Sequence, residues 1–226
     1  MQKAVLQIQV QDTLFVKDPT SSTIGKSILE HGLILLSEIG LEEFTFKKLA
    51  RKISSTESTI YRYFENKHQF LSYLFNYYWA WMDVNIAFAT TNIDDSEERL
   101  RRIMRVITQK VDNDLRTPFI DEALLQEVIS LESSKTFLSK KVDEENKAGY
   151  FLQYKKVIDR IVSVMLELNP DYSYPNALVT TILESSFHQR YFSNHLPKLS
   201  NSMDNPNRLE NFLLDLCLNT LYHHGK

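Results

Sequence analysis

The helical spacing of its apolar residues limits what this chain can fold into more than any other feature. Most long segments repeat apolar residues every three or four positions, as one face of an α-helix does. The 226 residues include only five glycines and six prolines, so few positions interrupt this spacing. The sequence therefore predicts an all-α protein of about nine helices.

Capping residues mark the expected helix ends. Residues 24–39 carry one apolar stripe, and Gly40 follows it where a left-handed C-cap residue belongs. Thr45 and Thr56 are placed to cap two short helices, and Asn66 with Gln69 has the pattern of a capping box for a fourth. Further helices are expected from Asp94 with Glu97, from Thr117-Pro118, and over residues 135–168, 175–194 and 207–223.

The first residues of the chain depart from helical spacing. Leu6, Ile8 and Val10 alternate with glutamines, and residues 14–16 are apolar again after a polar turn. This alternation predicts a short β hairpin or an extended arm. Because a two-stranded hairpin is marginally stable alone in water, we expect the arm to lean on another surface, such as a partner subunit.

Composition and charge exclude several classes of protein. The chain is 43% hydrophobic and 24% charged, with a formal net charge of −3, which fits an ordinary globular protein rather than one coated in basic charge. Cys217 is the only cysteine, and its apolar neighbours favour a buried, inert thiol. Neither a signal peptide nor a run approaching about 18 apolar residues is present, so we expect a cytoplasmic protein that does not enter the membrane.

A polar, aromatic stretch, STESTIYRYFENKH at residues 55–68, is unusual in an acidic helical protein. On a helical wheel Ile60 and Phe64 lie about 40° apart and point toward a core. Ser58 and Arg62 lie nearly opposite, where a short hydroxyl can approach base edges and an arginine can pair with guanine. This face suits the major groove of DNA, although the same spacing is expected of a solvated helix in an ordinary bundle.

Local charge favours the DNA interpretation. Between Phe44 and His68 there are six basic and two acidic side chains, which gives a local charge of +4 on an acidic chain. The basic residues are Lys47, Lys48, Arg51, Lys52, Arg62 and Lys67.

Residues 44–53 and 56–67 together resemble the DNA-binding domain of the TetR family of bacterial transcriptional regulators. They combine a short helix carrying Leu49-Ala50, a hydroxyl-led helix carrying Tyr-x-Tyr-Phe at 61–64, and Lys67 at the start of the next helix. The resemblance spans about residues 24–75. It implies a helix-turn-helix domain at residues 21–70 and a helical regulatory and dimerisation domain at 71–226, with residues 1–20 as an N-terminal arm.

The resemblance also implies roles for single residues. Thr45, Tyr61 and Lys67 match positions that contact phosphates in the family. The family lays the surface occupied here by Thr56, Ser58, Thr59 and Tyr63 in the major groove. From the residues themselves we add Lys47, Lys48 and Arg62, with an intramolecular salt bridge as the competing interpretation of Arg62.

Two positions depart from the family pattern. Ser54 stands where a turn glycine is usual, and Glu57 stands where a basic or small residue is common. A glutamate there can accept a hydrogen bond from cytosine or stabilise the positive end of the helix, and we favour the second role.

The resemblance implies dimerisation through the last two helices. Apolar and small residues recur at helical spacing there, as they also would in a core stripe within one chain. The predicted dimer residues are Leu178, Ile182, Gln189, Leu209, Phe212, Leu213, Leu216 and Thr220.

The aromatic run at residues 77–81 raises the question of a ligand pocket. Pockets are typically apolar with a few polar groups, although aromatic residues at this spacing more often form core. The predicted pocket residues are Tyr78, Trp81, Met82 and Met104. His188 and His195 lack a carboxylate at ligand spacing, so we expect no metal site, and no cofactor is indicated.

Together these features predict a DNA-binding transcriptional regulator, most often a repressor in this family. It would bind a palindromic double-stranded DNA operator as a homodimer and be released by an unidentified small-molecule effector. The alternative is an all-helical interaction protein that kept the scaffold without specific DNA binding. An enzyme is not expected, because the sequence has no nucleophile elbow and no glycine-rich phosphate loop.

Overall fold

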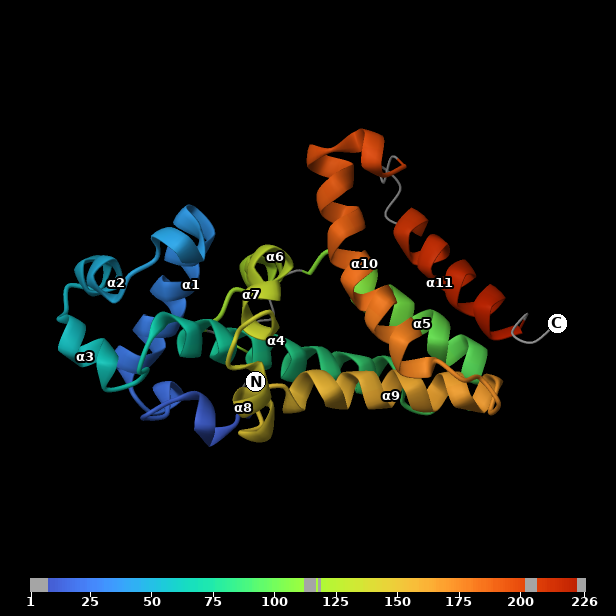
Figure 1. Cartoon of the computed structure of the whole chain (residues 1–226), viewed down its shortest axis with the longest axis horizontal. Coiled ribbons are helices and arrows are strands. Elements are labelled where there is room, and N and C mark those ends of the chain that lie inside the picture. The colour runs from blue at the N-terminus through green and yellow to red at the C-terminus, as the bar shows by residue number, and fades with distance from the viewer. Residues whose placement is uncertain (1–7, 112–116, 118, 202–206, 223–226) are drawn as a thin grey trace, which may run out of the picture. The chain divides into compact units, whose positions relative to one another are not determined.

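The computed structural model of this protein describes residues 8–111, 117, 119–201 and 207–222. Within them it contains eleven α-helices, three short 3-10 helices and no strand (Figure 1). The predicted all-α fold is therefore confirmed. The α-helices are α1 (Thr23–Glu43), α2 (Phe46–Lys52), α3 (Glu57–Tyr61), α4 (Lys67–Thr90), α5 (Ser96–Thr108), α6 (Glu122–Glu132), α7 (Ser134–Phe137), α8 (Val142–Lys147), α9 (Leu152–Leu168), α10 (Pro175–His195) and α11 (Asn207–Tyr222), and the 3-10 helices are η1 (Asp12–Leu14), η2 (Pro19–Ser21) and η3 (Pro197–Leu199).

The chain divides into two units. The first comprises residues 1–80 and 111–153, and the second comprises residues 81–110 and 154–226. Helices α4 and α9 each contribute residues to both units. The domain boundaries expected after residues 20 and 70 stay a prediction. No helix of the described residues has both the length and the apolar character needed to cross a membrane.

Hydrogen bonds at the helix starts confirm the predicted caps. The Thr45 hydroxyl accepts from the Lys48 N–H at 3.2 Å, and the Thr56 hydroxyl accepts from the Thr59 N–H at 3.3 Å. At α4 the Asn66 side chain accepts from the Gln69 N–H at 2.9 Å, while the Gln69 side chain accepts from the Glu65 N–H at 2.8 Å. Asn66 is therefore the predicted cap, but Gln69 bonds the residue before the cap rather than Asn66 itself, as a capping box would.

Gly40 has the predicted left-handed backbone, but α1 does not end there. Its φ of 68° and ψ of 169° bend α1, which continues to Glu43. The bend removes the helical partner of the Leu41 N–H, which donates instead to the Glu132 carboxylate of α6 at 3.1 Å. A side chain that follows 91 positions later therefore satisfies the bend in α1.

Aromatic side chains from α4 and from the segments that follow α1 and α3 pack together in the core of the first unit. The Phe70 ring stacks on Phe44 with centroids 5.5 Å apart and meets Phe64 edge-on at 5.1 Å. Helix α1 approaches this cluster at Gly32, where a Cβ atom would lie 2.4 Å from the Phe70 ring. The close approach therefore requires glycine at position 32.

The N-terminal arm differs from the prediction. Residues 8–16 contain no strand, and they form η1 around the fully buried Leu14. Leu6 lies outside the described residues. Leu14 packs into the first unit of its own chain, so burial within one chain gives the segment the support that we expected from another surface.

Three predicted helix boundaries are wrong. The pattern at 135–168 is divided among α7, α8 and α9, because the chain turns at residues 138–141 and again at residues 148–151, where Gly149 has φ of 86°. Helix α6 starts at Glu122 with Asp121 as its cap, rather than at Thr117. The cap of α5 is Asp95, one residue after the expected position. Helical periodicity continued across these turns and so concealed them.

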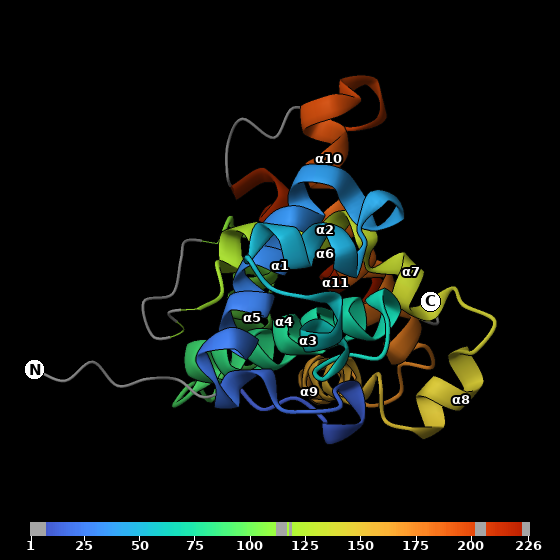
Figure 2. The same ribbon diagram turned by 90° about the vertical axis from the view of Figure 1, so that its left-hand side faces the viewer.

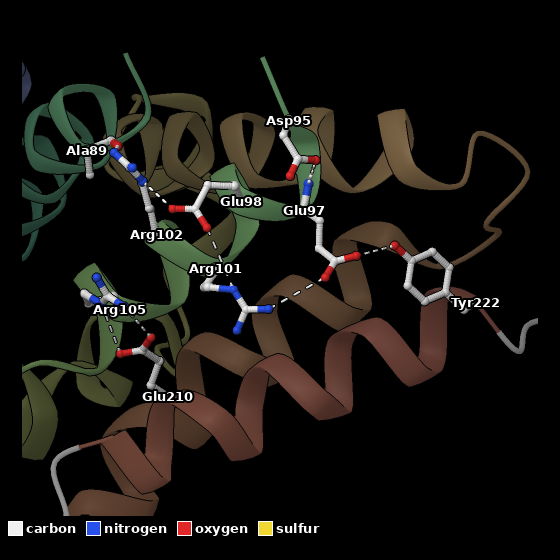
Figure 3. Close-up of polar contacts among 9 residues, drawn as sticks. All are labelled: Ala89, Asp95, Glu97, Glu98, Arg101, Arg102, Arg105, Glu210 and Tyr222. Carbon is white, nitrogen blue, oxygen red and sulfur yellow. Dashed lines mark hydrogen bonds and ion pairs between the residues drawn. The ribbon is translucent and has the colours of Figure 1, made fainter. Parts of the chain in front are cut away.

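Polar contacts tie α11 to α5 in the second unit (Figure 3). Arg105 of α5 pairs with the Glu210 carboxylate at 3.4 Å, and Tyr222 donates to Glu97 at 2.9 Å. These contacts lie near the two ends of α11. Cys217 is buried in the same helix, and burial raises the pKa of its thiol to about 12, which agrees with an inert thiol.

Candidate nucleic-acid interface

Helices α2 and α3 and the turn between them form a helix-turn-helix (Figure 2). Phe46, Leu49 and Ile60 are buried between the short helices and the core. The turn is closed by the Ser55 N–H, which donates to the Ala50 carbonyl at 2.8 Å. Ser54 has φ of 51°, so the position where glycine is usual has the left-handed backbone that favours glycine.

Most of the predicted DNA contacts are accessible. Thr59 and Lys67 are half-buried. The exposed residues are Thr45, Lys47, Lys48, Thr56, Ser58, Tyr61 and Arg62. They come from the starts of α2 and α3 and from the end of α3.

The hydroxyl groups at the start of α3 differ in whether they already make hydrogen bonds within the chain. The Thr56 oxygen caps the helix and lies 3.0 Å from the Thr59 hydroxyl. Ser58 is exposed between them. Ser58 is therefore the hydroxyl most available to a base edge, and Thr56 has a structural role that does not depend on a ligand.

The Tyr61 side chain packs against α2 and is also partly exposed to solvent. Its ring meets the Phe46 ring edge-on with centroids 5.1 Å apart, which joins α3 to α2. Half of the residue, 50%, remains exposed. This combination orients the side chain while leaving part of it accessible to a phosphate.

The prediction that Tyr63 lies on the exposed face is wrong. Tyr63 is only 1% exposed, and its hydroxyl lies 2.8 Å from the Ser22 hydroxyl at the start of α1. The wheel fails there because α3 ends at Tyr61, so later residues no longer turn in helical steps. Tyr63 is left out of the interface that we propose.

Three of the six basic residues have partners within the chain. Lys48 pairs with Glu43 at 3.0 Å and Lys52 pairs with Glu38 at 2.7 Å. The Lys67 ammonium donates to two backbone carbonyls at the end of α1, those of Leu41 at 2.8 Å and Glu42 at 3.0 Å. Lys67 therefore holds the segment that leads into α2.

The other basic residues, Lys47, Arg51 and Arg62, have no ion pair in the part of the chain that the structure describes. For Arg62 this argues against the intramolecular salt bridge. Arg51, which the sequence prediction includes in the local charge but not in the site, is a further candidate. Its place in the basic cluster of the sequence is the feature that could have identified it, and the structure shows that it is exposed on α2.

The family model described as "Bacterial regulatory proteins, tetR family" matches residues 28–74. This chain carries the DNA-binding domain of the TetR family. The TetR-family match covers α2 and α3 completely and reaches into α1 and α4. It therefore includes every predicted DNA contact. Among curated proteins, none matches this sequence.

Solved structures share the fold over most of the chain. AibR in complex with isovaleryl coenzyme A and operator DNA is 16% identical, with a TM-score of 0.59 over 84% of this chain and 96% of that chain. FadR, the fatty acid degradation regulator of Bacillus halodurans, is 17% identical, with a TM-score of 0.58 over 85% and 96%. The superantigen PfiT is 18% identical, with a TM-score of 0.56 over 89% and 97%. At these identities the similarity establishes the fold alone.

The predicted dimer residues fall into two groups. Leu178, Ile182, Leu209 and Leu213 are buried within the single chain, so intramolecular packing accounts for their spacing. The remaining predicted residues keep exposed surface: Phe212, which is 49% exposed, and the half-buried Gln189, Leu216 and Thr220.

The predicted pocket residues are all buried. Tyr78 belongs to the first unit, whereas Trp81, Met82 and Met104 belong to the second. A pocket of about 360 Å³ in the second unit is lined by other residues, Gln189, Asn201, Arg208 and Phe212. The ligand role of the four predicted residues stays a prediction.

Proposed function

We propose that this protein is a ligand-responsive regulator that binds double-stranded operator DNA through α2 and α3. One observation carries the proposal most directly. Ser58 and Arg62 are exposed on a TetR-family helix-turn-helix whose apolar side, including Ile60, is buried against its own core. A hydroxyl in α3 and the guanidinium of its C-cap residue, which has no ion pair among the described residues, suit base edges in the major groove.

Phosphate contacts would fix this helix on the duplex. We assign Thr45, Lys47 and Tyr61 to that role, and we add Arg51 because it is exposed near them on α2. Lys48 and Lys67 would each exchange an internal partner for a phosphate, so their net contribution is expected to be smaller. Thr56 and Thr59 are assigned to the groove beside Ser58.

A second copy of the chain would supply the second DNA-binding helix-turn-helix. Two half-sites about one helical turn, roughly 34–36 Å, apart require two reading heads. We place the dimer contact on the surface of α10 and α11 that the single chain leaves exposed, centred on Phe212, Leu216 and Thr220. The operator would then be palindromic.

We further propose a small-molecule effector, bound by the regulatory domain at residues 71–226, that lowers the affinity for DNA. The structurally similar AibR forms a complex with both isovaleryl coenzyme A and operator DNA. An effector of this kind acts through its different affinity for the DNA-binding and released conformations. We propose that the protein acts in the cytoplasm as a repressor, without a catalytic step.

The experiment that tests DNA binding is footprinting on the DNA adjacent to the gene, repeated at several salt concentrations. Specific protection should cover two related half-sites, and the logarithm of the affinity should fall linearly with the logarithm of salt concentration. A duplex of equal length and scrambled sequence is the control. Equal binding to both duplexes, or no salt-dependent binding to either, would contradict the proposal.

One comparison favours a second candidate. PfiT shares the fold and is described as a superantigen, so the scaffold also occurs in a protein known for another activity. An interaction protein of this kind would show no preference between the two duplexes. The footprinting experiment therefore separates the two candidates.

A further inference from the structure

Residues 8–22, which we call the N-terminal strap, hold the end of α3 through Tyr63. The Val16 N–H donates to the Tyr63 carbonyl at 2.8 Å, and the Ser22 and Tyr63 hydroxyls lie 2.8 Å apart. The Lys17 ammonium lies over the Tyr63 ring, 5.4 Å from its centroid. Three different groups of the strap therefore contact one buried residue just beyond α3.

The strap also contacts the start of α4. The Gln69 amide donates to the Thr13 carbonyl at 3.3 Å, while its oxygen accepts from the Glu65 N–H at 2.8 Å. Phe15 meets the Tyr73 ring edge-on at 6.2 Å. Gln69 is 5% exposed, and both of its hydrogen bonds are partly buried.

A third set of contacts joins the strap to the turn between α8 and α9 and to the start of α9. The Thr13 hydroxyl donates to the Ala148 carbonyl at 3.0 Å. The Gln153 amide donates to the Gln9 carbonyl at 3.2 Å. Thr13 thus bonds to the start of α4 through its backbone and to the α8–α9 turn through its side chain. The strap runs alongside these elements in Figures 1 and 2, where it is the dark blue segment before α1.

Helix α3 needs such support because it is short. Its five residues, Glu57–Tyr61, make little more than one turn, and helices of that length are unstable on their own. Its orientation therefore depends on contacts outside the helix, which include Ile60 in the core, Tyr61 against Phe46 and the contacts at its two ends. The Thr56 cap fixes one end, and the strap holds Tyr63 at the other.

We propose that the N-terminal strap is a positioning element of the DNA reader, with Tyr63 as its positioning residue. It fixes the end of α3 and links it mechanically to the α8–α9 turn, so a displacement of that turn changes the orientation of α3. The effect on DNA binding rests on the function proposed above, whereas the effect on α3 itself does not.

Val16→Pro in the full-length protein tests the first part. Proline removes the N–H that bonds to Tyr63, and the preceding Phe15 already has the extended backbone that proline requires, with φ of −154° and ψ of 157°. Val16→Ala is the matched control, because it keeps the N–H at a site that is 57% exposed. Amide hydrogen exchange is measured over residues 57–66, together with DNA affinity at several salt concentrations.

We expect faster exchange over residues 57–66 in Val16→Pro and unchanged exchange in Val16→Ala. DNA affinity should fall about three- to tenfold with an unchanged salt slope, because no phosphate contact is lost. Wild-type exchange and affinity in Val16→Pro would overturn the proposal, as would a reduced salt slope, which would indicate a direct phosphate contact. If the wild-type protein binds no DNA, the proposed function fails while the exchange comparison still decides the role of the strap.

Two further variants complete the test. If Val16→Pro does not fold, Tyr63→Phe removes only the hydroxyl contact with Ser22, and exchange over 57–66 should again increase. Thr13→Val removes the bond to Ala148 without changing a contact of α3. We expect Thr13→Val to increase exchange over both 146–153 and 57–66. An increase over 146–153 alone would overturn the link between the turn and α3.

Discussion

The carboxylate of Glu132 accepts a hydrogen bond from the backbone N–H of Leu41 at 3.1 Å, one residue after the bend at Gly40. Its other oxygen pairs with Lys135 at 2.6 Å, and Lys135 also reaches Glu42 at 3.0 Å. Burial lowers the pKa of Lys135, but its bonds to Glu132 and Glu42 outweigh burial, and the pKa is raised. One carboxylate on α6 thus fixes the path of the chain into α2.

Glu132→Ala should lower the free energy of unfolding by about 1–3 kcal/mol, because the buried Leu41 N–H loses its acceptor. Glu132→Gln keeps an oxygen for that N–H and should cost less. Urea denaturation measures both. Glu42→Ala is the control, since it removes an exposed partner of the same lysine and should have little effect. Equal losses for the alanine and glutamine variants would show that the charge, rather than the acceptor, matters.

Ser54→Gly should leave stability unchanged or raise it by up to about 1 kcal/mol, because glycine relieves the left-handed backbone but also loosens the unfolded chain. Ser54→Val should destabilise the protein by roughly 1–2 kcal/mol, since a β-branched residue tolerates positive φ poorly. Thermal unfolding provides the comparison. Ser55 does not have a positive φ, so Ser55→Gly relieves no backbone strain and should be destabilising. A loss in Ser54→Gly as large as in Ser55→Gly would exclude strain at position 54.

Arg62→Ala should weaken binding to the operator and relax base preference at one position by about 1–3 kcal/mol, because a bidentate contact to a base is lost. Stability should not change, since Arg62 has no ion pair among the described residues. Competition between operator variants measures the preference. Lys156→Ala on α9 removes an equal charge from another exposed position and serves as the control. Lower stability with unchanged base preference would support an intramolecular role for Arg62.

Phe212→Glu should weaken self-association by at least about tenfold, because it places a charge at the centre of the proposed dimer surface. Sedimentation velocity over a range of concentrations measures the change. Asn211→Glu is the control, as it adds the same charge at the adjacent exposed position of α11. If both variants associate as tightly as the wild type, the dimer surface lies elsewhere.

Local signals predicted the helix-turn-helix well. Caps such as Thr45 and Asn66 act within four residues, so the sequence contains both partners of each bond. The burial of Tyr63 depends instead on where α3 ends and on a contact with Ser22, 41 positions earlier. The apolar stripe of α11 could not be divided between core and dimer surface either. Leu213 and Phe212 are adjacent in sequence, and only the neighbouring helices determine that the first is buried.

Gly32 and Phe70 are in close contact, because a Cβ atom at position 32 would lie 2.4 Å from the nearest atom of the Phe70 ring. The residue at one of these positions therefore limits which residues are tolerated at the other, as long as α1 and α4 keep their present packing. A larger residue at 32 becomes tolerable only after the ring at 70 has been replaced by something smaller, and a smaller residue at 70 alone leaves a void. Among divergent descendants of this chain, substitutions at these two sites should therefore arrive in pairs and in a fixed order, with position 70 shrinking first.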